Sequence, residues 1–347
     1  MKICFLGDTH FGHKNGDKVF ADFQRKFYTK IFFPYIKKNK IERIIQFGDF
    51  FDSRKAIRHS TMKLVREVII DNSYDATNNV CIKWDVNVGN HDIHMKDSIH
   101  PNACTELLSI YPNFNIIDKP TTLSFDKLDI DIIPWICKEN KEEVFEFIKS
   151  SLSLYCIGHF ELNGFQYAKG ILSEGFSPDF LEHYIQVWSG HYHTESEGGN
   201  VHYIGNPYQM SFSDSDEERG FWIFDTISKN MEFVVNPYNL YTKVYYDSNT
   251  FDLNSISNYI DMNVKIIVED RGNAAQFDNV VELFSKVTAS QSVIDNIDVI
   301  QNNDLKIDIT DTLKIISDYI DELTETTKNK KEIKKIMTAL YKEGIGE

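Results

Sequence analysis

The sequence is poor in cysteine, in long apolar runs and in net positive charge, and each shortage excludes a class of protein. Its 347 residues include five cysteines, which are scattered and never spaced as Cys-x-x-Cys. This pattern excludes a disulfide framework and a zinc ribbon, and four of the five lie in or beside apolar segments, where we expect small core residues. No apolar run is long enough to cross a bilayer, and no secretory signal follows Met1. We therefore expect a soluble, cytoplasmic protein with no membrane partner.

The formal net charge is -15, the opposite of the basic balance that a protein needs to hold DNA by phosphate neutralisation alone. A DNA-binding protein of this composition would need positive charge from metal ions, from a local cluster of basic side chains or from a partner. If this chain binds DNA, its sequence should therefore contain metal ligands, a local basic cluster or a site for a partner.

One pattern recurs along the first 193 residues: an apolar run ends at a glycine, and a potential metal ligand follows. It occurs in KICFLGD, RIIQFGD, DVNVGN, LYCIGH and QVWSGH, which end at Asp8, Asp49, Asn90, His159 and His191. Short apolar runs bounded by glycine are typical of buried strands, and residues 19–38, 61–71 and 142–151 are expected to form helices between them. This alternation indicates an α/β fold. Because ligands gather beyond the carboxyl ends of strands in such sheets, the five positions should converge on one rim.

The potential ligands combine carboxylate, amide and imidazole groups without a thiolate. They are Asp8 and His10 in GDTH, Asp49 in GDFFD, Asn90 in GNHD, His159 in GHF, and His191 and His193 in GHYH. This set suits Mn²⁺, or Mg²⁺ as a second choice, better than a structural Zn²⁺. Seven ligands are too many for one ion once water and substrate are added, so they predict two ions about 3.5–4 Å apart that share a carboxylate. Each motif alone could be a turn or an exposed strand end, but five in this order favour the metal site.

With these motifs the sequence resembles the calcineurin-like metallophosphoesterases and, among them, the SbcD nuclease family, in particular its T-even phage branch. The segments HPNACTELL, IIPWIC, HFELNGF and RGFWIFD extend the resemblance beyond the ligands. It implies a four-layer α/β/β/α sandwich. It also implies that one ion is held by Asp8, His10, Asp49 and His193, and the other by Asp49, Asn90, His159 and His191. Where some members carry a histidine at the end of the second motif, this chain has Asp52.

The same resemblance implies a Mn²⁺-dependent nuclease subunit of an SbcCD-type complex that processes DNA ends in repair, recombination and replication. Such a subunit is a 3′-to-5′ exonuclease on duplexes and an endonuclease on single strands. It forms a homodimer and also binds an SbcC-type ABC ATPase that carries a coiled coil, in the cytoplasm of the bacterial host if the chain is encoded by a phage.

Two alternatives stay open: a metallophosphoesterase that acts on small phosphodiesters or phosphoproteins, and a non-enzymatic scaffold for DNA ends. Phosphoprotein phosphatases typically continue the second motif with Asp-Arg-Gly and end the third in Glu. This chain has Asp52-Ser53-Arg54 and Asp92 at those places, which favours the nuclease.

His91, directly after Asn90, is our candidate for the general acid, and it is similar to a family histidine that lies near the leaving group without binding metal. Two ions can clamp a phosphate and activate a bridging water, while an imidazole that titrates near neutral pH protonates the departing sugar oxygen. The alternative is that His91 only supports the metal ligands by hydrogen bonds. Other histidines, His13 among them, lack a strand-end context and receive no role.

A basic cluster follows the second motif directly. It consists of Arg54, Lys55, Arg58, His59 and Lys63. Beside a metal rim these side chains could bind phosphates on either side of the cut. The alternative is a solvated face of a helix.

The pattern changes after His193. We expect YIGNPYQ, GFWIFD and MEFVVNPY to be strands that close a second sheet over the first, which completes a nuclease domain over residues 1–239. Residues 240–300 predict a small α+β unit with strands KVYYD, VKIIVED and VIDNIDVI and helices over 255–261 and 274–287. By position it resembles the family's capping domain.

Residues 301–347 are expected to form two amphipathic helices. Ile309, Leu313, Ile316, Ile320 and Leu323 form a heptad-like seam in the first, and Ile333, Ile336, Met337 and Leu340 form a stripe in the second, behind a lysine-rich start. These faces either pack on the chain's own domains or bind a partner. The resemblance favours a partner, the coiled coil of the ATPase.

Overall fold

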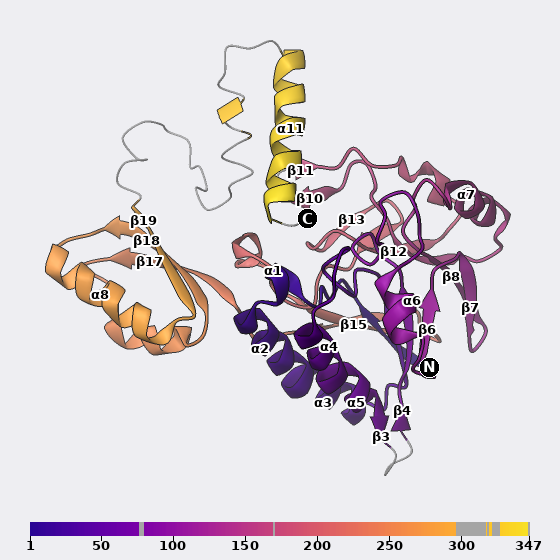
Figure 1. Ribbon diagram of the computed structural model, residues 1–347, viewed down its shortest axis with the longest axis horizontal. Helices are drawn as coiled ribbons and strands as arrows, with labels where there is room; N and C mark the ends of the chain where they lie inside the picture. The colour runs from indigo at the N-terminus through magenta and orange to yellow at the C-terminus, as the bar shows by residue number, and fades with distance from the viewer. Residues whose placement is uncertain (76–79, 169–170, 296–316, 318, 321–326, 346–347) are drawn as a thin grey trace. The chain divides into compact units, whose positions relative to one another are not determined.

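The computed structural model describes residues 1–75, 80–168, 171–295, 317, 319–320 and 327–345, which belong to two compact units (Figure 1). The first unit comprises Met1–Ala168, Leu172–Tyr208 and Glu217–Tyr238, and the second comprises the described parts of Lys169–Ile171, Gln209–Asp216 and Asn239–Glu347. Over this part of the chain, no helix has the length and apolar character that crossing a membrane requires.

The first sheet of the first unit has six strands in the order β16-β15-β1-β2-β5-β6. Their bounds are Met231–Val235, Gly220–Asp225, Lys2–Leu6, Arg43–Gln46, Lys83–Asn87 and Phe114–Ile117. The last four run parallel to one another, whereas β15 pairs antiparallel with β1 and with β16. The expectation that GFWIFD and MEFVVNPY close a second sheet is therefore wrong, because β15 pairs with the free edge of β1 and extends the first sheet.

The second sheet has the order β13-β14-β12-β9-β8-β7. Its strands are Ser196–Gly198, Val201–Tyr203, Gln186–Gly190, Tyr155–His159, Leu128–Ile133 and Thr121–Phe125. The four central strands are parallel and the two edge strands are antiparallel. β14 ends at Tyr203, so the strand predicted over YIGNPYQ contributes only its first residue.

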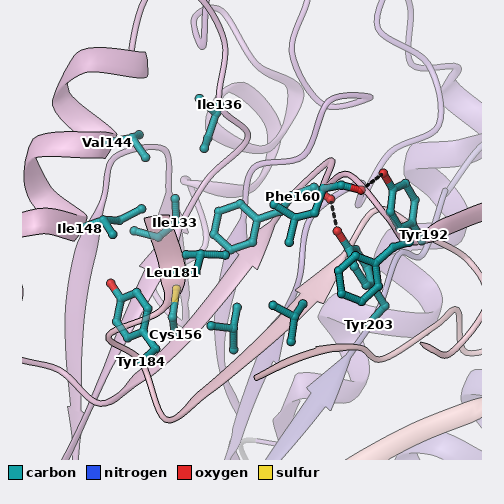
Figure 2. Close-up of a cluster of buried hydrophobic side chains, with 14 residues drawn as sticks. Ile133, Ile136, Val144, Ile148, Cys156, Phe160, Leu181, Tyr184, Tyr192 and Tyr203 are labelled. Atoms are coloured by element: carbon teal, nitrogen blue, oxygen red, sulfur yellow. Dashed lines mark hydrogen bonds between the residues drawn. The ribbon is translucent and has the colours of Figure 1, made fainter. Parts of the chain in front are cut away.

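The two sheets pack face to face, and helices cover their outer faces. Phe5 of β1 lies 5.2 Å from the rings of Phe47, Trp188 and Phe224, and so joins strands of both sheets. On the outer face of the second sheet, α7 (Lys141–Ser150) packs Val144 into a cluster with Cys156 and Leu181 (Figure 2). These contacts, with helices over the first sheet, make the predicted α/β/β/α arrangement.

Helical segments that follow β1 and β2 cover the first sheet. They are α2 (Lys18–Phe27), the π-helical η1 (Tyr28–Phe32), α3 (Phe33–Lys38), α4 (His59–Val65), the π-helical η2 (Arg66–Ile70) and α5 (Asp71–Ser73). The helices predicted over 19–38 and 61–71 are therefore present, each interrupted by one π-helical turn. Phe32 lies 6.3 Å from Trp84 and 5.0 Å from Phe221, ring to ring, which fixes this layer on the sheet.

The structure also contains shorter elements. They are α1 (His13–Gly16), β3 (Tyr74–Asp75), β4 (Val80–Cys81), α6 (Ala103–Leu108), β10 (Gln166–Ala168), β11 (Ile171–Leu172) and η3 (Pro178–Leu181), together with η4 (Phe212–Asp214), which belongs to the second unit. All five cysteines are free and four of them are buried, as predicted.

The second unit contains a parallel three-stranded sheet, β17-β18-β19, with bounds Tyr241–Asp247, Asn263–Asp270 and Ser290–Asp295. The helix α8 (Ala274–Val287) packs Phe277 and Phe284 against Val244 and Ile266 of the sheet. The segment predicted as a helix over 255–261 is a 3₁₀ helix, η5 (Leu253–Tyr259). The role of this unit as a capping domain, and its boundaries at 240 and 300, stay predictions.

The predicted C-terminal helices are described in part. Ile309, Leu313, Ile316 and Leu323 lie outside the described residues, whereas Ile320 is buried, with 3% of its surface exposed. Ile333, Ile336 and Leu340 belong to α11 (Thr327–Ile345), where Ile336 is 59% exposed.

Candidate metal centre

Loops at the carboxyl ends of strands from both sheets bring the seven predicted ligands together in the first unit. Asp8 and His10 follow β1, Asp49 follows β2, Asn90 follows β5, His159 ends β9, and His191 and His193 follow β12. Their ligand atoms form close groups, Asp8 with His10 and His193, and Asp49 with His159 and His191. A further group joins His10 with Asp52 and His91. The convergence expected from the strand ends is therefore present.

Asp49 stands between the two halves of the cluster. Its Oδ2 lies 3.3 Å from Nε2 of His159 and 3.9 Å from Nε2 of His10. Asn90 Oδ1 lies 3.0 Å from the same His159 nitrogen and 2.9 Å from Nδ1 of His191. Asp49 thus lies close to ligands predicted for both ions.

The hydrogen bonds around His159 show that the cluster suits a cation. Its Nδ1 lies 2.9 Å from the carbonyl oxygen of Phe47, which can only accept, so Nδ1 carries a hydrogen. Nε2 of the neutral ring would present a lone pair to the oxygens of Asn90 and Asp49. Acceptor atoms this close need a proton or a metal ion between them, and a divalent ion can take the proton's place.

His10 repeats this arrangement in the other half of the cluster. Its Nδ1 lies 3.2 Å from Oδ1 of Asp52, so the hydrogen belongs on Nδ1 and the Nε2 lone pair faces Nε2 of His193 at 3.2 Å. The donor set on both sides of Asp49 therefore fits divalent metal ions.

The electrostatics of the metal-free cluster agree with this fit. Burial lowers the pKa of His159, but Asp49 and Asp8 oppose it and raise the pKa to about 9. For His10, burial likewise lowers the pKa, and Asp52 and Asp49 raise it to about 10. Without a cation these imidazoles hold protons, so metal binding has to displace them.

Three of the predicted ligands have a left-handed backbone, which L-residues rarely adopt. The φ angles are 43° at His10, 52° at Asp49 and 85° at His191, and each such residue costs about 1–3 kcal/mol. Hydrogen bonds hold the strained loops, because the carbonyl of Asp49 accepts from His10 N at 3.0 Å and Asp8 Oδ2 accepts from His191 N at 2.9 Å. The cluster is therefore pre-organised by the surrounding loops.

The glycine before each ligand allows the loops to approach this closely. A Cβ at Gly89 would lie 2.2 Å from both N and Oδ1 of Asp49, and one at Gly190 would lie 2.5 Å from Oδ1 of Asp8. No side chain fits at either position. The recurring glycine in the motifs is thus a packing requirement of the cluster.

Sequence reasoning missed two buried side chains that hold the ligand loops. Asp92 accepts from the backbone N–H groups of Gly89 at 2.9 Å, Phe51 at 2.9 Å and Phe50 at 3.2 Å, and so joins the second and third loops. Arg219 donates to the carbonyl oxygen of His193. The only sequence signals were their places in GNHD and RGFWIFD, which carry no information about a partner.

Asp52 and His13 form a pair that the sequence also left unassigned. Oδ1 of Asp52 lies 3.0 Å from Nδ1 of His13 as well as 3.2 Å from Nδ1 of His10. Burial raises the pKa of Asp52, but the close contacts with His10 and His13 outweigh it and hold that pKa well below its usual range. A charged Asp52 therefore fixes the tautomer of His10.

His91 lies beside the cluster, with its ring 4.9 Å from that of His10. Its Nδ1 lies 2.7 Å from the carbonyl oxygen of Asp52 and so carries a hydrogen, which leaves Nε2 for another partner. Burial lowers the pKa of His91 and outweighs the opposing effect of Asp49, so the substrate-free imidazole is neutral at pH 7. The position of His91 suits both a proton donor to bound substrate and a metal ligand. The number of metal ions bound by a His91 variant distinguishes these roles.

The basic residues after the second motif differ in their surroundings. Arg54 is half-buried, and burial lowers its pKa while Asp49 opposes that effect, which places Arg54 near the cluster. Lys63 is 76% exposed, with Nζ 3.7 Å from Oε1 of Glu67 in an i,i+4 pair typical of a solvated helix face. Lys55 and Arg58 are exposed. DNA binding by these four residues stays a prediction.

We expect Asp52→Asn to weaken Mn²⁺ binding about 10- to 100-fold, because it removes the charge that holds the Nδ1 hydrogen of His10. Isothermal titration calorimetry measures the affinity directly. Asp129→Asn, at an exposed carboxylate outside the cluster, is the control and should leave it unchanged. An unaltered affinity in Asp52→Asn would show that Asp52 does not position His10.

Comparison with known proteins identifies the family. The family model described as calcineurin-like phosphoesterase matches residues 1–212. "Exonuclease subunit 1" of Enterobacteria phage T4 is 40% identical over 336 residues, which cover 96% of each chain. Two solved structures are less similar, an archaeal phosphodiesterase at 17% identity and GAP50 of Plasmodium at 10%.

The match to the phosphodiesterase covers 68% of this chain and 100% of the phosphodiesterase chain, with a TM-score of 0.34. The match to GAP50 covers 85% of this chain and 97% of the GAP50 chain, with a TM-score of 0.39. The family match spans more than half of the chain and includes all seven predicted ligands. The chain therefore belongs to the calcineurin-like phosphoesterases, a family that uses divalent metal ions.

Proposed function

We propose that this chain is the nuclease subunit of an SbcCD-type complex and hydrolyses DNA phosphodiesters with two Mn²⁺ ions. The observation that carries the proposal is the convergence of lone pairs on both sides of one buried carboxylate, Asp49. The similarity to a phage exonuclease subunit along 96% of the chain supports DNA as the substrate. The 3′-to-5′ polarity, single-strand cutting, the homodimer and a location in the host cytoplasm stay predictions.

In this proposal Asp8, His10 and His193 would hold one ion, Asn90, His159 and His191 would hold the other, and Asp49 would contribute to both. When bound, the ions would supply positive charge to the phosphate and make water a better nucleophile near neutral pH. The chain contributes rigid placement, because the ligand loops are held by the Asp49 and Asp8 hydrogen bonds described above.

His91 supplies the remaining proton in the proposed reaction. Its Nδ1 hydrogen points to the carbonyl of Asp52, so Nε2 is the atom that carries a proton to the departing sugar oxygen. The approach of an anionic phosphate favours the imidazolium that burial alone disfavours. The proposed acid role therefore requires the imidazolium form of His91 when substrate is bound.

The experiment compares wild type with Asp49→Ala on linear duplex DNA and on a chromogenic phosphodiester in Mn²⁺. Wild type should hydrolyse both substrates. Asp49→Ala should hydrolyse neither, because loss of the Asp49 carboxylate disables both ion sites. Asp129→Ala is the matched control and should retain activity. If wild type hydrolyses the small diester but not DNA, the result would support a small-molecule phosphoesterase. If wild type hydrolyses neither substrate, the result would support a scaffold.

We expect His91→Asn to bind two Mn²⁺ ions and DNA while its single-turnover rate falls by about 10²- to 10⁴-fold, because asparagine cannot donate the proton. Metal content is measured by elemental analysis after gel filtration. A variant that retains only one ion would make His91 a ligand and remove the acid role.

We also propose that the C-terminal helices bind the coiled coil of an SbcC-type ABC ATPase. Exposed apolar side chains on α11, Ile336 and Met337, support this, because a solitary subunit would leave them in water. The burial of Ile320 supports the alternative, packing of the first helix on the chain itself.

Ile336→Glu should abolish co-purification with the ATPase, because it places a charge in the interface, and should leave the melting temperature of the isolated subunit unchanged. Lys331→Glu, at another exposed position of α11, controls for the change in charge. Full capture of the ATPase by Ile336→Glu would contradict the proposed interface.

A further inference from the structure

Trp135 borders the candidate metal centre and has no role in the proposed reaction. It follows β8 in the segment IIPWIC, and its backbone N–H donates to the carbonyl of Val88 at 2.8 Å. Because Val88 precedes Gly89 and Asn90, this bond ties the tryptophan to the third ligand loop. Trp135 therefore lies on the same rim as the predicted ligands.

The indole contacts the imidazoles predicted to hold one of the two ions. Its ring centroid lies 5.1 Å from that of His191 at an interplanar angle of 46°, and 6.0 Å from that of His159 at 70°. These are ordinary separations for interacting aromatic rings. Trp135 is half-buried, so part of the residue remains exposed to solvent.

The other three tryptophans lie in different surroundings. Trp84 and Trp188 are buried core residues, and the indole N–H of Trp222 donates to the carbonyl of Ile204 at 3.2 Å. Within the described part of the chain, Trp135 is thus the tryptophan that adjoins the ligand cluster.

We propose that Trp135 stacks on the nucleobase next to the scissile phosphate and thereby makes the site selective for nucleotide esters. The inference rests on the proposed nuclease function and adds a specificity-determining residue to it. A phosphate at the ligand cluster carries its sugar and base within reach of the rim. An aromatic ring accepts any base, because every base has a π-face.

The charge of the chain gives this contact particular weight. Because the chain has a net charge of -15, attraction to the phosphate backbone contributes less to binding than it does in a basic protein. Stacking of one base on an aromatic side chain strengthens binding about 5- to 150-fold. It requires no positive charge.

The alternative is that Trp135 only buttresses the rings of His159 and His191. The two roles differ in which substrates they affect. A buttress acts on every phosphodiester equally, because it acts through the metal ligands, whereas a stacking platform acts only on substrates that carry a base.

The test compares two chromogenic esters with the same leaving group, the p-nitrophenyl ester of thymidine 5′-phosphate and methyl p-nitrophenyl phosphate, in Mn²⁺. The measured quantity is the ratio of kcat/KM for the thymidine ester to that for the methyl ester. Trp135→Leu should lower this ratio about tenfold, chiefly through KM, and Trp135→Phe should retain most of it because the phenyl ring keeps a π-face. Trp222→Leu, at the half-buried tryptophan of β15, should leave the ratio unchanged.

Calorimetric titration with thymidine 5′-phosphate provides a readout independent of turnover, and Trp135→Leu should weaken its binding by a similar factor. An unchanged ratio in Trp135→Leu, whether both esters lose activity equally or neither does, would overturn the stacking role while leaving the nuclease proposal intact. Hydrolysis of neither ester and no digestion of DNA by wild type would overturn the nuclease proposal and this inference with it.

Discussion

The arrangement of the candidate site depends on one buried carboxylate and the loop that carries it. The backbone carbonyl of Asp49 accepts hydrogen bonds from the backbone N–H groups of Thr9 and His10 at 3.1 and 3.0 Å. The side-chain Oδ1 of Asp49 accepts one from the backbone N–H of His91 at 2.7 Å. Its other oxygen faces the nitrogens of His159 and His10. A single residue thereby connects the first, second, third and fourth ligand loops, and 1% of its surface is exposed.

A buried anion of this kind is stable only with compensating positive charge. In the metal-free chain, protonated His159 and His10 provide it, as their raised pKa values show. Two divalent ions would replace those protons and satisfy the lone pairs that converge from both sheets. The strained φ angles and the crowded glycines are the structural cost of bringing so many acceptors together.

Much of this site was predictable from the sequence because its geometry leaves a local trace. Each ligand loop needs a buried strand, a glycine without a Cβ and then a ligand, and these follow one another along the chain. The places of β15 and β16 were not predictable, because strand pairing depends on which edge is free in the folded sheet. The contacts of Asp52 with His13 and of Arg219 with His193 join residues distant in sequence, and a polar side chain alone does not reveal its partner.

The proposed sharing of Asp49 by two ions is tested most directly by the electron paramagnetic resonance spectrum of the protein with two equivalents of Mn²⁺. Two ions about 3.5–4 Å apart that share a carboxylate should give the spectrum of a spin-coupled pair. The six-line spectrum of isolated Mn²⁺ at full loading would contradict the bridged site, and with it the assignment of Asp49.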